Sequence, residues 1–138
     1  MGYGPDFWGL TACDALPEGY RAHTPGVGED FGTIAPTAAL SSMPYTPEES
    51  MAVLKNLYRN LGSVAFGIMG FYDAVNLSLG EPRSTESYIA IDQGPILVMI
   101  ENHRNATVWN AFMKKNDIRR GLDRLGFTIN HKTIEYTK

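Results

Sequence analysis

The sequence is poor in cysteine and in long hydrophobic runs. One cysteine among 138 residues cannot form a disulfide within the chain. The longest aliphatic run, Ile96 to Ile100, is far shorter than the roughly 20 residues of a membrane helix, and the first residues lack a basic-then-apolar signal pattern. Cys13 and the histidines His23, His103 and His131 lack the short spacing of zinc ligands. We expect no metal, no cofactor and no membrane segment.

An excess of positive charge is also missing. The chain has 12 Lys and Arg against 15 Asp and Glu, and a formal net charge of -3. This balance gives no long-range attraction for nucleic acid or anionic lipid, and the basic residues are scattered apart from two adjacent pairs. Glycine-rich nucleotide-binding loops and the Gly-x-Ser-x-Gly elbow are absent. We therefore expect no nucleic-acid partner, no nucleotide site and no nucleophilic serine.

The apolar content is that of a single folded domain, but the two parts of the chain differ. Hydrophobic residues make up 43% of the sequence, enough for a core. Residues 1 to about 45 are rich in Gly, Pro, Thr and Ala and show no sustained helical or strand period. Irregular stretches longer than about 12–15 residues are usually functional or packed on something else. We expect loops that cover a larger body.

The first predicted helix covers residues 46–61. Thr46, Pro47 and Glu49 have the spacing of a capping box with proline at the first helical position. Apolar residues then recur at helical spacing on one expected face: Met51, Leu54, Leu57, Tyr58 and Leu61. Gly62 is expected to end the helix.

Three more helices are predicted after a glycine-rich segment, residues 66–73, that is expected to be strand or loop. The second helix begins at Asp92 as N-cap and runs through the aliphatic residues 96–100 to Asn102. Such a helix is apolar on every face, so other elements must enclose it. The third helix covers about 106–115, and the fourth runs from 116 or 117 to a stop at Gly126.

Four acids lie in apolar or glycine-rich surroundings, where a charged group is unusual and indicates a functional site: Asp14, Asp73, Asp92 and Glu101. Structural alternatives exist for three of them, because Asp14 fits a turn, Asp92 fits a helix cap and Glu101 could pair with an arginine. Asp73 has no capping or periodic reason for its position. Trp8 could stack on a sugar ring or anchor a loop to the core. Cys13 has no identifiable base beside it and fits a small buried residue.

Several strings of the sequence resemble one family. They occur in order and with compatible spacing over residues 3–127: Trp8 to Asp14, Gly32 to Ala39, Gly70 to Asn76, Ile91 to Ile96 with Met99 to Asn102, and Asp117 to Leu122. Together they resemble the C-terminal part of the glycoamylase-like domain, a family that includes bacterial glucoamylases and endo-β-1,2-glucanases. We therefore assign residues 1–127 to the C-terminal part of such a domain and residues 128–138 to a tail.

The resemblance implies an all-α fold, namely the C-terminal portion of an (α/α)6 barrel with a loop-rich N-terminal stretch. Loops at one end of the inner helices would form the pocket. The upstream segment of the same domain, on this chain or on another, would then be a partner that completes it. The resemblance also implies a bacterial protein in the periplasm or secreted.

The function implied is glycoside hydrolysis of a glucan or oligosaccharide, such as β-1,2-glucan, by an inverting enzyme. Its general acid would lie upstream, and Asp73 would be the catalytic base. The implied substrate-binding residues are Trp8, Asp14, Thr33, Asn76, Asp92, Gln93 and Glu101. Two alternatives stay open: a non-catalytic carbohydrate-binding or scaffold fragment, and a transglycosylase that makes cyclic glucans.

Overall fold

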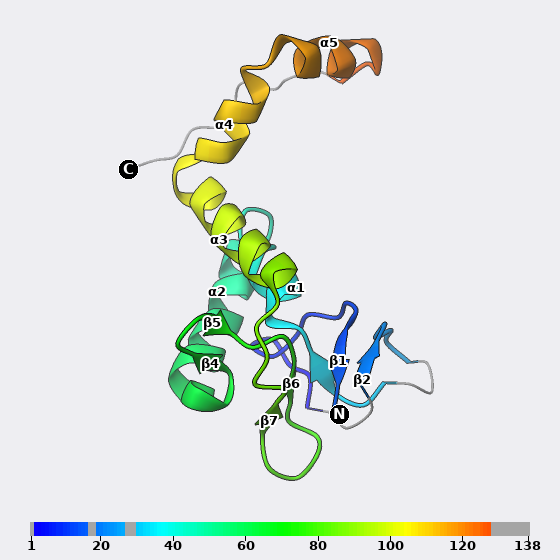
Figure 1. Cartoon of the computed structure of the whole chain (residues 1–138), viewed down its shortest axis with the longest axis vertical. Helices are drawn as coiled ribbons and strands as arrows, with labels where there is room; N and C mark the ends of the chain where they lie inside the picture. The colour runs from blue at the N-terminus through cyan, green and yellow to red at the C-terminus, as the bar shows by residue number, and fades with distance from the viewer. Residues whose placement is uncertain (1, 17–18, 27–29, 128–138) are drawn as a thin grey trace.

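The computed structural model describes residues 2–16, 19–26 and 30–127. Short strands and loops occupy the first part of the chain, and helices dominate the second (Figure 1). The predicted tail, residues 128–138, lies outside the described residues.

The chain is not all-α, because seven short strands form three small antiparallel sheets among the described residues. The first sheet pairs β1 (Cys13–Ala15) with β2 (Gly19–Arg21), and the second has the order β3 (Thr33–Ile34), β6 (Val75–Asn76) and β7 (Arg83–Ser84). The third pairs β4 (Phe66–Gly67) with β5 (Gly70–Phe71), so the strand alternative for residues 66–73 is confirmed. Strands of two or three residues are too short to show alternation in a sequence.

The loop-rich N-terminal part contains one helix among its described residues, α1 (Pro36–Leu40). Proline occupies the start of this five-residue helix, where its missing N–H costs nothing. No regular element before residue 46 exceeds that length in the described ranges, as the lack of periodicity predicted.

The first predicted helix is present as α2 (Pro47–Lys55), followed by a π-helical turn η1 (Asn56–Leu61) and a 3-10 turn η2 (Gly62–Val64). Gly62 ends the π-helical turn with a φ of 53°, which glycine adopts without strain. The predicted capping box is wrong. The Thr46 hydroxyl makes no cap hydrogen bond, and donates instead to the Ser42 carbonyl oxygen, 3.3 Å away.

The buried side of α2 and η1 also differs from the predicted face. Ser50, Val53 and Leu57 are buried, whereas Met51 and Tyr58 are exposed. The Ser50 hydroxyl donates to the Ala39 carbonyl oxygen at 2.8 Å, so a satisfied polar group sits where α2 meets α1. A helical wheel based on apolar letters alone could not include this serine.

The remaining helices are α3 (Ala90–Asn105), α4 (Thr107–Met113) and α5 (Asn116–Arg124). The prediction that Asp92 is an N-cap is wrong, because Ile89 holds that position and accepts hydrogen bonds from the N–H groups of Asp92 and Gln93. Asp92 therefore lies in the first turn of α3. The three helices follow one another away from the rest of the molecule (Figure 1).

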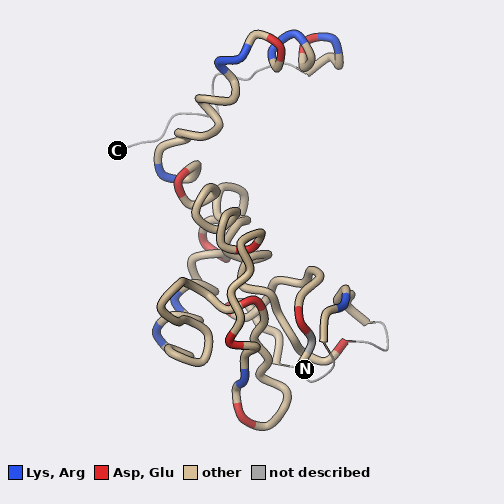
Figure 2. Tube along the Cα trace, viewed as in Figure 1, with Lys and Arg blue, Asp and Glu red and all other residues tan. Residues whose placement is uncertain are grey.

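The α3–α4 junction is built around one buried amide. The side-chain oxygen of Asn102 accepts hydrogen bonds from the N–H groups of Val108 and Trp109, at 3.1 and 3.0 Å. Ala106, between the helices, takes a left-handed conformation with a φ of 53°. Beyond α4, several basic residues lie on and just before α5, with Asp117 and Asp123 among them in the sequence (Figure 2). These are Lys114, Lys115, Arg119, Arg120 and Arg124.

The hydrophobic core lies where β3, β5, β6, α1, α2 and the start of α3 meet. Its buried members are Phe7, Ile34, Ala39, Leu40, Val53, Leu57, Ala65, Phe71, Val75 and Ile96. From the aliphatic run of α3 only Ile96 is in this cluster as a buried residue, whereas Leu97 is 73% exposed. Of the helices in the described ranges, none has the length and apolar character needed to cross a bilayer.

Candidate functional site

Asp73 follows β5 and lies below the surface. Its side chain and backbone together are only 2% exposed, and its N–H donates to the Ser87 carbonyl oxygen at 3.0 Å. The carboxylate oxygen Oδ2 accepts a 2.8 Å hydrogen bond from the backbone N–H of Asp14 on β1. A buried carboxylate is tolerated where such donors meet it.

Asp92 approaches Asp73 from the first turn of α3. The Thr37 hydroxyl donates to the Asp92 carbonyl oxygen at 3.0 Å and so ties α1 to this turn. Burial, together with the hydrogen bond and the charge of Asp73, raises the pKa of Asp92 to about 6. Its carboxyl oxygen Oδ2 is buried and has no hydrogen-bond partner among the described residues.

The two carboxyl groups form the centre of an acidic cluster. A hydrogen bond between two carboxyls needs one proton, because two carboxylates offer only acceptors. Cys13 lies beside them, and burial followed by the charges of Asp73, Asp14 and Asp92 raises the pKa of its thiol to about 12. The thiol is therefore neutral near pH 7 and a poor nucleophile, as expected for a small buried residue.

An open hollow of about 440 Å³ adjoins this cluster. It lies between the loop before β1, β2, α1 and the start of α3, and its lining residues are Leu10, Thr11, Ala12, Tyr20, Thr37, Ala38, Ser41, Ile91, Asp92 and Pro95. Asp92 is the only acid in this lining. Asp73 is buried and is not among the lining residues, so of the two carboxyls only that of Asp92 borders the hollow.

Gln93 holds the β4–β5 hairpin against α3. Its side-chain amide donates to the Phe71 carbonyl oxygen at 2.6 Å. A β-carbon on Gly70 would lie 2.3 Å from the Gln93 Oε1 atom, and the φ of Gly70 is +118°. Glycine at residue 70 therefore allows the hairpin to reach Gln93, and Gln93 sets the distance between the hairpin and Asp92.

A pair of half-buried tyrosines lies against Gly67 of the same hairpin. The rings of Tyr72 and Tyr88 have centroids 5.1 Å apart, and the hydrogen bond to Tyr88 is the main cause of the raised pKa of Tyr72. A β-carbon on Gly67 would lie 2.0 Å from the Tyr88 hydroxyl. We had not selected these tyrosines from the sequence, although the aromatic residues beside Asp73 were a visible signal.

Thr33 and Asn76 pair across β3 and β6 and are fully buried. The Asn76 amide donates to the Thr33 hydroxyl at 2.7 Å and to the Phe31 carbonyl oxygen at 2.8 Å. The side-chain oxygen Oδ1 of Asn76 accepts a hydrogen bond from the Ser78 N–H at 2.6 Å. These hydrogen bonds hold the sheet from which Asp73 is presented, and substrate binding by either residue stays a prediction.

Trp8 and Glu101 lie apart from the acidic cluster. Trp8 is partly buried and packs against the main core, which agrees with the anchoring alternative and leaves stacking untested. Glu101 lies nine residues beyond Asp92 on α3, about 13 Å along the helix axis. It accepts hydrogen bonds from Thr107 and Asn105, which lower its pKa.

Within the described ranges, no group of three or more His, Cys, Asp or Glu side chains has a geometry that could hold a metal ion. The arrangement instead brings together two carboxyls, an open hollow and a proton that they can share. This is chemistry suited to moving a proton to or from a ligand.

Comparison with known proteins identifies the family. A family model described as "Putative glucoamylase" matches residues 1–116. The chain belongs to the glycoamylase family. The resemblance noted in its sequence strings is therefore confirmed.

Individual relatives carry names from glucan chemistry. An "exo beta-1,2-glucooligosaccharide sophorohydrolase (non-reducing end)" from Parabacteroides distasonis is 45% identical over 125 residues, covering 91% of this chain and 17% of that protein. The structure of an endo-beta-1,2-glucanase from Chitinophaga pinensis, in complex with sophorotriose and glucose, is 48% identical with a TM-score of 0.83. That match covers 91% of this chain and 29% of the glucanase chain.

A beta-1,2-glucanase structure from Parabacteroides distasonis is similar at 46% identity and a TM-score of 0.80, over 89% of this chain and 17% of that chain. This glycoamylase-family chain thus spans less than a third of the length of each of these relatives.

Proposed function

We propose that the protein containing this chain is a glycoside hydrolase that acts on a β-1,2-linked glucan, with Asp73 as the general base. The observation that carries the proposal is the buried carboxyl of Asp73, held by the Asp14 N–H and in contact with Asp92 beside an open hollow. The family and the names of the relatives supply the substrate class.

Glycoside hydrolysis with inversion needs two carboxyls on opposite faces of the sugar, about 6.5–9.5 Å apart, with a water between one of them and the anomeric carbon. Asp73 raises the pKa of Asp92 through a hydrogen bond and its charge, which places the two carboxyls side by side rather than on opposite faces of a sugar. The pair therefore belongs to one side of the reaction. We propose the base side, with the general acid in the upstream part of the domain.

The other polar residues take supporting roles in this proposal. Gln93 and Asp14 fix the two elements that carry the carboxyl pair. Trp8 and Glu101 are proposed to contact more distant sugar units, and Thr33 and Asn76 to hold the sheet behind the site. Location in the periplasm or outside a bacterial cell is part of the same proposal.

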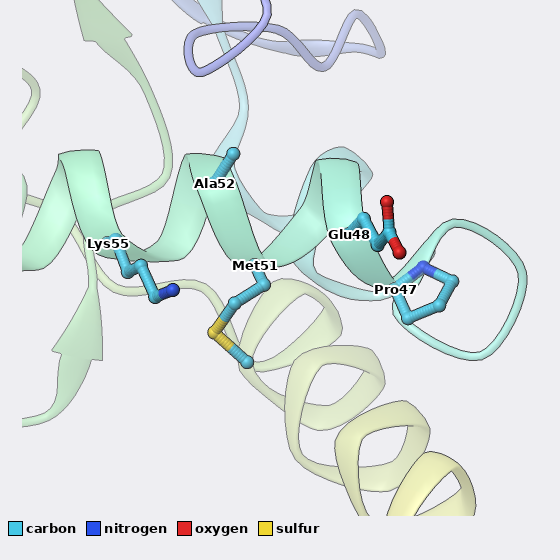
Figure 3. A pocket seen from close by; sticks show the side chains of 5 residues that line it. All are labelled: Pro47, Glu48, Met51, Ala52 and Lys55. Carbon is cyan, nitrogen blue, oxygen red and sulfur yellow. The ribbon is translucent and has the colours of Figure 1, made fainter.

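The complete domain is proposed to be an (α/α)6 barrel, with an upstream segment packed on this chain. Three exposed apolar residues of α3 support it, since Ile91 is 77% exposed, Leu97 73% and Val98 less so. Along the exposed side of α2 runs a second hollow of about 450 Å³ (Figure 3), with Met51 and Ala52 between the polar Glu48 and Lys55. Apolar surface of this extent is costly in water.

The test is the reaction of the complete protein with β-1,2-glucan, and with β-1,3- and β-1,4-glucans of similar length as matched substrates. Proton NMR during the first minutes would report the anomeric form of the product. We expect cleavage of the β-1,2-glucan alone, with α-configured product from the β-linkage. Cyclic products without free reducing ends would indicate the transglycosylase, and binding without any product would indicate the non-catalytic module.

A further inference from the structure

Two neighbouring carboxyl groups need hydrogen-bond donors, and the hydrogen bonds of Asp73 and Asp92 differ in this respect. Asp73 Oδ2 has its own donor, the Asp14 N–H, at 2.8 Å. Asp92 Oδ2 is buried and receives no hydrogen bond from the described residues. A buried carboxylate oxygen without a donor is costly, and a proton on Asp92 would reduce that cost and give Asp73 a second donor.

We propose that Asp92 keeps a proton at its contact with Asp73 and that the two carboxyls act as one base, in which Asp92 faces the hollow. This deepens and rests on the proposed function. Asp73 is 2% exposed and does not line the hollow, so a water in the hollow meets Asp92 first. Because Asp73 is buried, a second group is needed to take the proton from a water in the hollow and pass it to Asp73.

The groups that surround the pair favour a proton there. From β1, the backbone N–H of Asp14 and the neutral thiol of Cys13 lie beside the carboxyls, and the loop after β5 contributes Asp73 itself. Two neighbouring carboxylates repel each other, so one of the two carboxyls loses its proton only at a higher pH. Burial, then the hydrogen bond to Asp73, then the charge of Asp73 raise the pKa of Asp92 to about 6.

The proton transfer balances as follows in the proposed hydrolysis. As the water oxygen attacks the anomeric carbon, a water proton passes to Asp92, and the proton already shared between the carboxyls moves fully onto Asp73. The glycosidic C–O bond breaks, and the leaving oxygen takes its proton from a carboxylic acid in the rest of the domain. Release of one proton to solvent restores the pair, and uptake of one proton from solvent restores the carboxylic acid.

The first experiment measures protonation without substrate, so that it does not depend on turnover. The complete protein is labelled with ¹³C at aspartate side-chain carboxyls and titrated by NMR. We expect one carboxyl with a midpoint near pH 6 that is absent in Asp92→Asn and shifts to lower pH in Asp73→Asn. If the protein shows no aspartate titration above pH 5, or if the signal persists in Asp92→Asn, the shared proton is overturned.

The second experiment measures turnover of β-1,2-glucan by Asp73→Asn, Asp92→Asn and the double variant. Asparagine at residue 92 can still donate an N–H to Asp73 but cannot pass on a proton. Each single variant should lose about 10²-fold in kcat, and the double variant at most a few-fold more, because one base is removed only once. Near-normal kcat for Asp92→Asn, or losses that multiply to about 10⁴-fold, would overturn the inference.

The two experiments separate this inference from the proposed function. A complete protein that titrates as expected but hydrolyses no glucan would contradict the proposed function and leave the shared proton supported. Turnover of β-1,2-glucan with neither a titration near pH 6 nor an effect of Asp92→Asn would support the function and contradict the inference. Thermal melts of the single variants show whether each has folded.

Discussion

The backbone N–H of Asp14 donates a 2.8 Å hydrogen bond to the carboxylate of Asp73, across 59 residues of sequence. This bond joins the first sheet to the loop after β5, where the acidic cluster lies. The register of β1 with β2, in which Asp14 is opposite Tyr20, fixes the direction of that N–H. A small two-stranded sheet, invisible as a pattern in the sequence, thus positions the proposed base.

Gly67→Ala should destabilise the protein, because the new β-carbon would lie 2.0 Å from the Tyr88 hydroxyl and 2.6 Å from that of Tyr72. Inserting an extra carbon into a packed site typically lowers the free energy of unfolding by about 1–3 kcal/mol. Gly121→Ala is the matched control, since its β-carbon meets nothing within 4 Å on a helix, and alanine favours a helix by up to about 1 kcal/mol. Thermal unfolding should show a lower Tm for the first variant alone, and equal Tm values would contradict the packing described.

Asn102→Leu should weaken the α3–α4 junction, because the N–H groups of Val108 and Trp109 would lose their acceptor. A typical hydrogen bond contributes about 0.5–1.5 kcal/mol to stability, so the loss of both should cost about 1–3 kcal/mol. Asn102→Asp keeps an acceptor oxygen at the same place and should lose less. Denaturant unfolding of the two variants gives the comparison, and equal losses would show that the acceptor is not what matters.

The unfolding free energy should depend on pH through Asp92. Its pKa is about 6 in the folded protein against an ordinary value of 3.8, so between these values the folded state holds a proton that the unfolded state has released. This contribution to stability therefore falls as pH rises from about 4 to 6 and is constant above. Asp92→Asn removes it. Relative to that variant, the parent protein should lose stability over this window; parallel pH curves for the two proteins would refute the assignment.

Leu97→Gln should have opposite effects in two contexts. In the isolated 138-residue chain, Leu97 is 73% exposed, so the change should reduce aggregation and the binding of an apolar dye. In the complete protein, the proposed upstream segment covers this residue, and the same change should lower the Tm. A Tm that does not change in the complete protein would show that nothing packs on this side of α3.

The helical part of the fold was predictable because its helices carry apolar runs or recognisable end signals in the sequence. Residues 90–105 show an aliphatic run, and Gly62 and Gly126 mark helix ends with positive φ values. The N-terminal end of α3 was misplaced because Asp92 has the side chain of a good cap, while the backbone of Ile89 takes that position. Local preference lost to tertiary packing there.

The site was only partly predictable, because its residues are far apart in the sequence and meet only through tertiary packing. Asp14, Asp73 and Asp92 were predicted as acids in apolar or glycine-rich surroundings and Gln93 through the family resemblance, and the structure brings these four together. Glu101 was selected by the same criterion but lies far along α3. The order in which Asp73 and Asp92 meet the hollow depends on the packing of α1, β1 and α3, which no spacing in the sequence encodes.

The most direct test of the central claim is the turnover of β-1,2-glucan by Asp73→Asn in the complete protein. Asparagine keeps the size of the side chain and an oxygen that can accept the Asp14 N–H. Glu81→Gln, an exposed acid in the turn before β7, is the charge-matched control. We predict a loss in kcat of about 10²-fold or more for Asp73→Asn, with substrate affinity retained and the control unaffected. A kcat within a few-fold of the parent value, in a variant that melts normally, would contradict the account.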